Sequence, residues 1–217
     1  MSEKKNHYDS KYFDWQKSLG LFGGWANAPK FFNSIKADDL VLDFGCGGGF
    51  LLNNLKCKRK IGIEPNVSAL NSINSFGITH FFSCDEAISV LGENSIDVII
   101  SVHVLEHCHN PYLELSALRR LLKPGGVIHF LVPCDSPNVK YNPANIDKHL
   151  YSWSPSNIAN LFDALNFSVV KARRDVSVWP PFFHKLRFLG WRTFNFLCKV
   201  WGRIDRRYYQ IEVIANK

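Results

Sequence analysis

Residues 40–49 read LVLDFGCGGG, and they are the most informative part of the chain for its fold. Four of its first five residues are apolar, as in a strand buried within a sheet, and glycine follows directly. Glycine at a turn from a strand into a helix lets a ligand approach the backbone closely. The stretch therefore predicts a strand at 40–44, a ligand-binding turn, and a helix over roughly 48–55.

Strands and helices alternate along the rest of the chain. The apolar run in 95–105 is nearly continuous, as expected for a strand covered on both faces. The alternation predicts an α/β fold with a Rossmann-like sheet of seven strands, mostly parallel, with helices on both faces and the last strand antiparallel. The expected strands lie at 40–44, 60–65, 78–83, within 95–105, and at 127–133, 167–173 and 210–216. The expected helices lie at 48–55, 66–76, 111–122 and 154–165.

Composition points to a single domain over 1–217, of ordinary hydrophobic and charged content. The N-terminal residues show no apolar signal region, and no run of 18 uncharged apolar residues exists. We therefore expect neither a signal peptide nor a transmembrane helix. The six cysteines are scattered without a C-x-x-C pair, which argues against a disulfide framework or a structural zinc site. This pattern favours a reduced, cytoplasmic protein.

Acidic residues mark the ends of the first two strands. Asp43 precedes Gly45 by two residues, and Glu64 follows the apolar part of the second strand. The G-x-G-x-x-G/A fingerprint of dinucleotide sites fails, because Phe50 stands where Gly or Ala is expected. Asp43 would repel a pyrophosphate and attract a cation. The turn therefore favours a cationic ligand.

The ordered motifs of residues 40–173 resemble class I S-adenosylmethionine-dependent methyltransferases. They are VLDFGCGGG, GIEP, the acid pair at 85–86, VLEH and LLKPGGVI. The resemblance implies that S-adenosylmethionine is the cofactor. It places Asp43 near the ammonium group of the cofactor and Glu64 on the ribose hydroxyls. Asp85 would accept from the adenine amino group, with Glu86 as the alternative.

Further residues of the expected cofactor site follow from the same resemblance. Gly45 and Gly47 would face the methionine part of the cofactor, and Cys46, Pro65 and His103 complete the site. The N-terminal segment 1–38 is an expected helical lead-in, and its YFDWQKSLGLFGGWA resembles the lead-in of such methyltransferases. Within it, the side chains expected to fold over the cofactor are Tyr12, Trp15 and Gln16.

The stretch His103-Val-Leu-Glu106-His107 matches the H-x-x-E-H signature of one class of zinc proteases. In zinc proteases the two histidines share a helix face. Here the motif follows a strand directly, and Asn110-Pro111 breaks the chain soon after, so we expect neither a protease nor the zinc site of one. The carboxyl end of a strand is nevertheless where ligands bind in an open α/β sheet.

Three interpretations of this stretch stay open. His107 or His103 is a general base, since a pKa near neutrality suits that role. Alternatively the group binds a divalent cation, as the acid-x-x-Glu-His arrangement of the similar ubiquinone-pathway O-methyltransferases can. Here His103 replaces the first acid, whereas Mg²⁺ prefers oxygen ligands. In the third interpretation Glu106 and His107 hold the loop through hydrogen bonds.

A second candidate base lies in DKHLYSWSP, residues 147–155. The resembled methyltransferases carry a His-x-Tyr/Arg-x-Phe/Trp-Ser/Thr-Pro segment that lines the acceptor pocket. His149 and Tyr151 are therefore candidate acceptor contacts, and His149 is also a candidate base. Packing of both side chains against the sheet edge is the alternative.

The formal net charge of +7 belongs to one C-terminal region, because ten Lys or Arg and two Asp or Glu lie between Lys171 and Arg207. A basic aromatic insertion, 176–209, separates the last two expected strands. If 183–207 forms one helix, steps of about 100° per residue divide its side chains into two sides. The apolar side holds Phe183, Leu186, Trp191, Phe194, Leu197, Trp201 and Ile204. The basic side holds Lys185, Arg192, Lys199, Arg203, Arg206 and Arg207.

This pattern is typical of a helix lying in a membrane interface. A lid, core packing or a homodimer contact is the alternative, and the chain shows no motif that reads nucleic acid. We expect an enzyme that methylates a hydroxyl of a small molecule or glycan. The glycan rests on a resemblance to methyltransferases of bacterial surface-polysaccharide pathways. The alternatives are a quinone or phenol O-methyltransferase at the membrane surface and a non-catalytic S-adenosylmethionine-binding protein.

Overall fold

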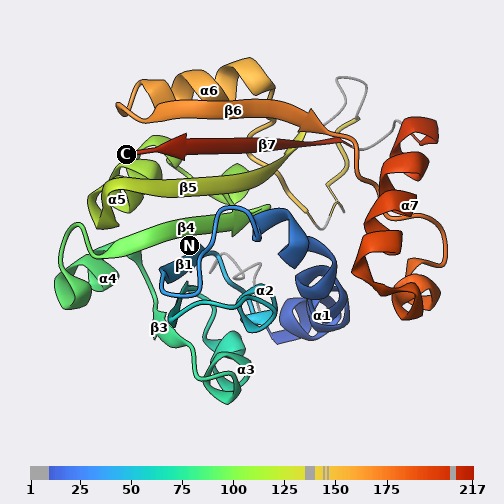
Figure 1. Ribbon diagram of the computed structural model, residues 1–217, viewed down its shortest axis with the longest axis horizontal. Coiled ribbons are helices and arrows are strands. Elements are labelled where there is room, and N and C mark those ends of the chain that lie inside the picture. Colours follow the sequence, from blue (N-terminus) through green and yellow to red (C-terminus); the bar gives the residue numbers. More distant parts are fainter. Residues whose placement is uncertain (1–9, 135–139, 144, 146, 206–208) are drawn as a thin grey trace.

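A seven-stranded sheet in the order β3-β2-β1-β4-β5-β7-β6 forms the centre of the computed structural model (Figure 1). The structure describes residues 10–134, 140–143, 145, 147–205 and 209–217, with side chains described from Leu19 onward. Neighbouring strands from β3 to β5 pair in parallel, and β7 runs antiparallel to both β5 and β6. The predicted fold class, including the antiparallel last strand, is confirmed.

The elements follow the expected alternation closely. The strands are β1 Leu40–Phe44, β2 Arg59–Ile63, β3 Thr79–Phe81, β4 Ile96–Val102, β5 Leu122–Cys134, β6 Ser168–Asp175 and β7 Tyr209–Asn216. The α-helices are α1 Ser10–Phe31, α2 Phe50–Asn53, α3 Leu70–Ser75, α4 Cys84–Leu91, α5 Pro111–Leu121, α6 Pro155–Asp163 and α7 Gly190–Ile204. Three short 3₁₀ helices are η1 Val67–Ala69, η2 Leu105–His107 and η3 Phe183–Leu189.

Helices cover both faces of the sheet (Figure 1). Alternate residues of β1 point to opposite faces, as the pleat of a strand requires. Leu42 and Phe44 join a core cluster with residues of α4, α5 and α6, whereas Val41 joins a cluster with residues of α1, α2 and α3. This double coverage explains why the central strands are almost wholly apolar.

Helix α4 was not expected from the sequence. Its N-terminus is fixed by Ser83, whose Oγ accepts a hydrogen bond from the Glu86 amide at 3.2 Å. The Glu86 carboxylate in turn accepts from the Phe82 amide at 2.6 Å. The acid pair at 85–86 therefore lies in the first turn of a helix, where negative charge is favourable.

The expectation of a single helix over 183–207 is wrong. Gly190, with φ +76° and ψ 160°, separates η3 from α7, and residues 206 and 207 lie outside the described part of the chain. Two residues of the expected apolar side are exposed, Trp191 (39%) and Ile204 (69%), whereas Phe194 and Cys198 are buried. Among the described residues, no helix is long and apolar enough to cross a bilayer.

Candidate active site

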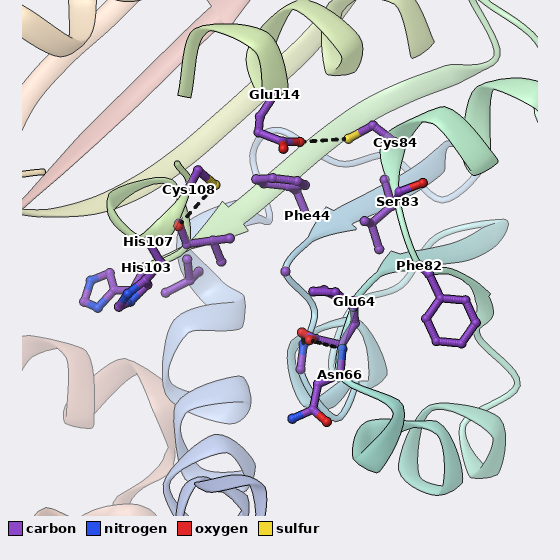
Figure 2. Close-up of a pocket in the computed structure, with 16 residues that line it drawn as sticks. Phe44, Glu64, Asn66, Phe82, Ser83, Cys84, His103, His107, Cys108 and Glu114 are labelled. Carbon is purple, nitrogen blue, oxygen red and sulfur yellow. Dashed lines mark hydrogen bonds between the residues drawn. The ribbon is translucent and has the colours of Figure 1, made fainter. Parts of the chain in front are cut away.

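A cavity of about 420 Å³ opens at the carboxyl ends of β1, β2 and β4 (Figure 2). Small molecules bind in pockets of about 300–1,000 Å³, so the volume suits a metabolite-sized ligand. The lining residues are Phe44, Gly45, Gly47, Ile63, Glu64, Pro65, Asn66, Phe82, Ser83, Cys84, Val102, His103, Val104, His107, Cys108 and Glu114.

The glycine turn after β1 needs glycine for two separate reasons. Gly45 has φ +71°, and a Cβ on it would overlap the Val104 side chain. Its amide donates to the Ile63 carbonyl at 2.9 Å, which ties the turn to the end of β2. Gly47 has φ +50° and open space where a Cβ would stand. The turn therefore leaves its backbone accessible at the floor of the cavity.

Glu64 is the acid that the cavity holds most firmly. Its Oε2 accepts a hydrogen bond from the Gly47 amide at 2.9 Å, and its Oε1 accepts from the Asn66 amide at 2.9 Å. Burial raises the pKa of the Glu64 carboxyl, and the two amides act in the opposite direction. The carboxylate thus joins the turn after β1 to the turn after β2 in one orientation.

Asp43 lies at the end of β1 and is only 3% exposed. Burial raises its pKa well above the ordinary range of an aspartate, and the Glu64 charge adds to the shift. Asp43 is not among the residues that line the cavity. Two neighbouring acids in a low-dielectric site favour a cation, because a positive charge offsets both the burial and their mutual repulsion.

The other predicted cofactor residues have different surroundings. Pro65 lines the cavity. The Cys46 side chain packs against Gly62, where a Cβ would lie 2.5 Å from its sulfur, so the backbone of Cys46 is the part that faces the turn. Asp85 and Glu86 are not among the lining residues, and Glu86 caps α4. The side chains of Tyr12, Trp15 and Gln16 lie outside the described part of the structure.

His103 lines the cavity directly after β4, with φ +55°. Its Nε2 lies 3.3 Å from the Gln210 Oε1, and the Gln210 Nε2 donates to the Asp175 Oδ2 at 2.8 Å. The Lys30 ammonium donates to the same Asp175 oxygen at 2.9 Å. Because the side-chain nitrogen of Gln210 donates its hydrogen bond to Asp175, the side-chain oxygen of Gln210 faces the imidazole of His103. His103 therefore donates from Nε2 and keeps the lone pair on Nδ1.

The pKa of His103 is lowered from its ordinary value. The ring lies on the cavity wall, where solvent still reaches it, but the surrounding protein disfavours the charged form and Lys30 adds to the effect. The imidazole is therefore neutral at neutral pH.

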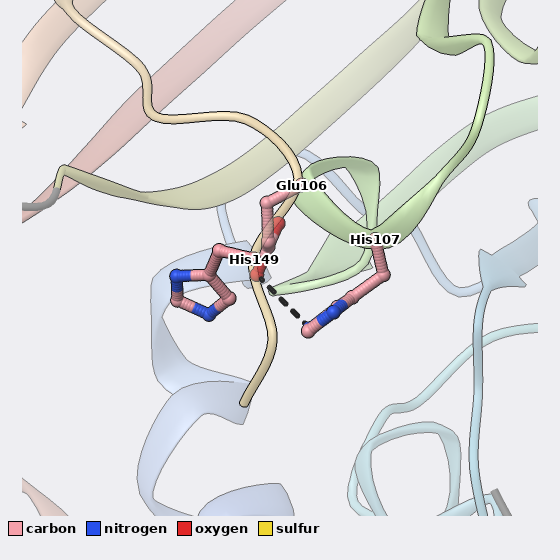
Figure 3. A group of neighbouring side chains, drawn as sticks. All are labelled: Glu106, His107 and His149. Atoms are coloured by element: carbon pink, nitrogen blue, oxygen red, sulfur yellow. Dashed lines mark ion pairs between the residues drawn. The ribbon is translucent and has the colours of Figure 1, made fainter. Parts of the chain in front are cut away.

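Glu106 and His107 of η2 form a group with His149 of the loop after β5 (Figure 3). Glu106 is fully buried, and its Oε1 lies 3.7 Å from the His107 Nε2. The rings of His107 and His149 are 5.1 Å apart, and the three side chains offer ligand atoms within 4.8 Å of one another. His103 is not part of the group, and Leu105–His107 is only one short turn. The geometry of a zinc-protease helix is therefore not formed.

The loop that carries His149 is held by the backbone of η2. The Glu106 carbonyl accepts hydrogen bonds from the Leu150 amide at 2.9 Å and the Tyr151 amide at 3.3 Å. The Tyr151 hydroxyl donates to the His109 carbonyl at 3.0 Å, and its ring stacks on Trp153. Of the two predicted acceptor contacts, neither His149 nor Tyr151 lines the cavity, whereas His107 does.

Several lining residues were not predicted from the sequence. Phe82 and Ser83 reach the cavity because they precede α4, which was not expected. Glu114 was overlooked because its place on the cavity wall depends on how α5 packs. The N-cap at Asn110 was a usable signal, since it puts Glu114 in the first turn of α5, next to the end of β4. The Cys84 thiol lies 3.6 Å from the Glu114 Oε2.

Comparisons with known proteins agree on one family. Residues 20–172 match the family described as "Methyltransferase domain". The ubiquinone biosynthesis O-methyltransferase of Brucella anthropi is 28% identical over 149 residues, which cover 64% of this chain and 58% of the relative. The enzyme of the same name from Cereibacter sphaeroides is 33% identical over 113 residues, covering 47% of this chain and 42% of the relative. The chain thus spans about half the length of these relatives.

A solved structure shares the whole fold. The crystal structure of a SAM-dependent methyltransferase from Archaeoglobus fulgidus superimposes with a TM-score of 0.67 at 18% identity, covering 95% of this chain and 99% of the other. This likeness confirms the arrangement of the seven strands.

Proposed function

The chain belongs to the methyltransferase domain family, and from that premise we propose that it transfers a methyl group from S-adenosylmethionine to a hydroxyl of a small molecule or glycan. The class of enzyme and the cofactor predicted from the sequence agree with the family. The relatives it spans in part are O-methyltransferases by name, which supports oxygen as the acceptor atom.

The observation that carries the proposal is the fixed carboxylate of Glu64 on the cavity wall. Two backbone amides hold it, at Gly47 and Asn66, so its remaining lone pairs face the cavity. A carboxylate in this position suits two neighbouring hydroxyl donors, as on a ribose. Asp43 and Glu64 together suit the positive charge of the cofactor, and the backbone of Gly45 and Gly47 leaves room for its methionine part.

The adenine end of the cofactor would lie between Pro65 and the residues before α4. Phe82 and Ser83 line the cavity there. Of the two acids expected at this end, Asp85 is the better candidate, because the Glu86 carboxylate accepts the Phe82 amide in the cap of α4.

When bound, the cofactor supplies an electrophilic methyl group for in-line displacement by the acceptor oxygen. The protein then has to orient the acceptor and take up its proton. His107 is our first candidate for the base, because it lines the cavity and pairs with the buried Glu106, which would stabilise the protonated ring. His103 offers a neutral Nδ1 on the same wall, and its lowered pKa makes it the weaker base. His149 would act beside His107 and orient its ring.

A quinone or phenol acceptor is the second candidate. It is supported by the names of the relatives and by the Glu106, His107 and His149 group, whose ligand atoms could hold a cation against two acceptor oxygens. A non-catalytic S-adenosylmethionine-binding protein is the third. A cytoplasmic location, a homodimer, and the bounds 1–38 and 176–209 stay predictions.

Calorimetric titration with S-adenosylmethionine tests the cofactor site. We expect micromolar binding by the intact protein and a loss of about 10- to 100-fold in Glu64→Gln, because hydrogen bonds to a charged group contribute about 1.5–3 kcal/mol. Glu86→Gln is the matched control, which should keep the affinity. Equal losses in both variants would contradict the assignment of Glu64.

An acceptor screen tests the reaction. Production of S-adenosylhomocysteine is measured with sugars, phenols and quinols, each with and without EDTA. Turnover of a hydroxylated acceptor that EDTA leaves unchanged supports the first proposal. Turnover of a catechol or quinol alone, abolished by EDTA, would replace it by the second. Cofactor binding with turnover of no acceptor would favour the non-catalytic protein.

A further inference from the structure

Residues 182–204, on η3 and α7, expose aromatic and basic side chains together, and we call this region the basic aromatic surface. Its most exposed apolar side chains are Phe182 (69%), Phe188 (83%), Phe196 (64%) and Ile204 (69%). The same segment holds five cationic side chains, all exposed, and no Asp or Glu. They are Lys185, Arg187, Arg192, Lys199 and Arg203.

The opposite side of α7 is packed firmly on the domain. Phe194 is fully buried, and its ring centroid lies 5.3 Å from that of Phe22 on α1. Gly202 lies so close to the Val176 carbonyl that no Cβ would fit. Cys198 is also buried in this contact. Because these contacts fix the helix, its exposed side chains do not fold back onto the core in the described structure.

We propose that the basic aromatic surface binds the surface of an anionic phospholipid bilayer. Aromatic and aliphatic side chains enter the boundary between headgroups and acyl chains, and the cations beside them meet the lipid phosphates. A peripheral contact of this kind needs no membrane-spanning helix, and none is found among the described residues.

The charge of the surface decides between a bilayer and a second copy of the chain. A two-fold dimer places the same patch of each copy against the other. The five cations of one copy would then face the five cations of the other, which is unfavourable. A nucleic acid duplex would satisfy the charge but would leave Phe188 and Phe196 exposed to water, whereas a bilayer takes up both kinds of side chain.

The position of the surface gives the contact a consequence. η3 and α7 follow β6, which runs parallel to β1, β4 and β5. They therefore lie at the end of the sheet where the carboxyl termini of these strands are found (Figure 1). Asp175, the last residue of β6, is bound to Lys30 and through Gln210 to His103 on the cavity wall. Binding would therefore hold the cavity edge of the domain near the bilayer.

Vesicle sedimentation of the full chain tests the proposal without any need for activity. The probes are equimolar phosphatidylcholine–phosphatidylglycerol vesicles and pure phosphatidylcholine vesicles, each at low and high salt. We expect binding to the anionic vesicles, weakened by salt, and little binding to the neutral ones. Lys199→Gln with Arg203→Gln should weaken binding by roughly thirtyfold, and Phe188→Ser with Phe196→Ser by at least about tenfold.

Matched controls come from other exposed positions. Lys56→Gln with Lys58→Gln removes as much charge, and Val90→Ser with Leu113→Ser removes apolar side chains exposed by 66% and 60%. Neither control should change vesicle binding. The proposal is overturned by equal binding to both vesicle types, by no binding to either at low salt, or by equal losses in the controls. It is also overturned if the test variants change the oligomeric state in light scattering while vesicle binding stays intact. Calorimetry with S-adenosylmethionine keeps the outcome separate from the cofactor site, because all four variants should bind it normally.

Discussion

The two sides of the cavity are built over very different distances along the chain. On the proposed cofactor side, the Glu64 carboxylate is held by the amide of Gly47, 17 residues away, and by the amide of Asn66. On the proposed acceptor side, His103 contacts Gln210, 107 residues away, and the Glu106 carbonyl holds the loop of His149. The cofactor side is thus defined by two adjacent strands and their turns, whereas the acceptor side needs the complete sheet. Substitutions should separate the two sides.

The largest expected effect is on the acceptor side. His107→Asn should lower kcat by about 10²- to 10⁴-fold, because general-base catalysis contributes an effect of this size. The dissociation constant of S-adenosylmethionine should stay within about threefold of the original, since the substitution does not touch Glu64, the proposed cofactor contact. Steady-state kinetics with the acceptor found in the screen, together with calorimetry, check both values.

Two histidine controls sharpen this prediction. His149→Asn should have an intermediate effect, because this ring lies beside His107 but does not line the cavity. His109→Asn, at an exposed position, should leave kcat unchanged. Equal losses of cofactor affinity and kcat in His107→Asn would mean that the two sides are not separable.

The next effect belongs to the cofactor side. Gly45→Ala forces a side chain onto the Val104 methyl groups at φ +71°, so the turn must move. We expect the affinity for S-adenosylmethionine to fall about hundredfold and the free energy of unfolding to fall by about 2–3 kcal/mol. Gly77→Ala is the control, since Gly77 has φ +64° but open space around its Cα. It should cost about 1 kcal/mol and leave the affinity unchanged, as calorimetry and chemical denaturation would show.

The same contrast explains how much could be predicted from the sequence. The strand at 40–44 was located correctly because a buried strand followed by glycine is a local pattern, and the strand expected at 210–216 lies within β7. The roles of Asp43 and Glu64 stay predictions. Helix α4 was missed because it is short and its cap involves Phe82 and Glu86 rather than an apolar repeat. A single helix over 183–207 was expected because periodicity does not show the left-handed backbone of Gly190.

The contacts on the acceptor side could not be predicted from the spacing of residues along the chain. The sequence shows that two residues separate His103 from Glu106, but it does not show that His103, with its positive φ, stays outside the group of Glu106, His107 and His149. Nothing in the neighbourhood of His149 indicates that its loop returns to Glu106. Such contacts depend on the packing of the whole sheet.

The strands next to the acceptor side contain an ion-paired glutamate, Glu212, whose charge should stabilise the fold. Glu212 on β7 lies 3.3 Å from the His129 Nε2 and 2.7 Å from the Lys171 ammonium, and these partners lower its pKa to about 2. A lowered pKa stabilises the fold above the ordinary pKa of glutamate, and this contribution is lost as pH falls toward about 2. Glu212→Gln should reduce the free energy of unfolding at neutral pH by about 2 kcal/mol and flatten its decline in acid.

Denaturation at a series of pH values checks this expectation. Glu93→Gln is the control, because the Glu93–Arg120 pair is about half exposed and should contribute no more than about 0.5 kcal/mol. If the free energy of unfolding of Glu212→Gln declines in acid as steeply as that of the original protein, the stability of the sheet does not depend on this charge.

The smallest expected effect is a release of protons when the cofactor binds, and it concerns the cofactor side of the cavity. The pKa of Asp43 is raised well above its ordinary value by burial and by Glu64, so this carboxyl takes up a proton at a higher pH than an ordinary aspartate does. A cationic ligand favours the ionised carboxyl, so binding should release a proton and affinity should fall by a few-fold as pH decreases. Calorimetry at mildly acidic pH in two buffers of different ionisation enthalpy measures this release as a difference in apparent binding enthalpy. Asp43→Asn should abolish it and His103→Asn should not, because the His103 ring is already neutral. If the unmodified protein instead takes up a proton when the cofactor binds, Asp43 is not the group that titrates. The titrating group would then lie on the acceptor side of the cavity.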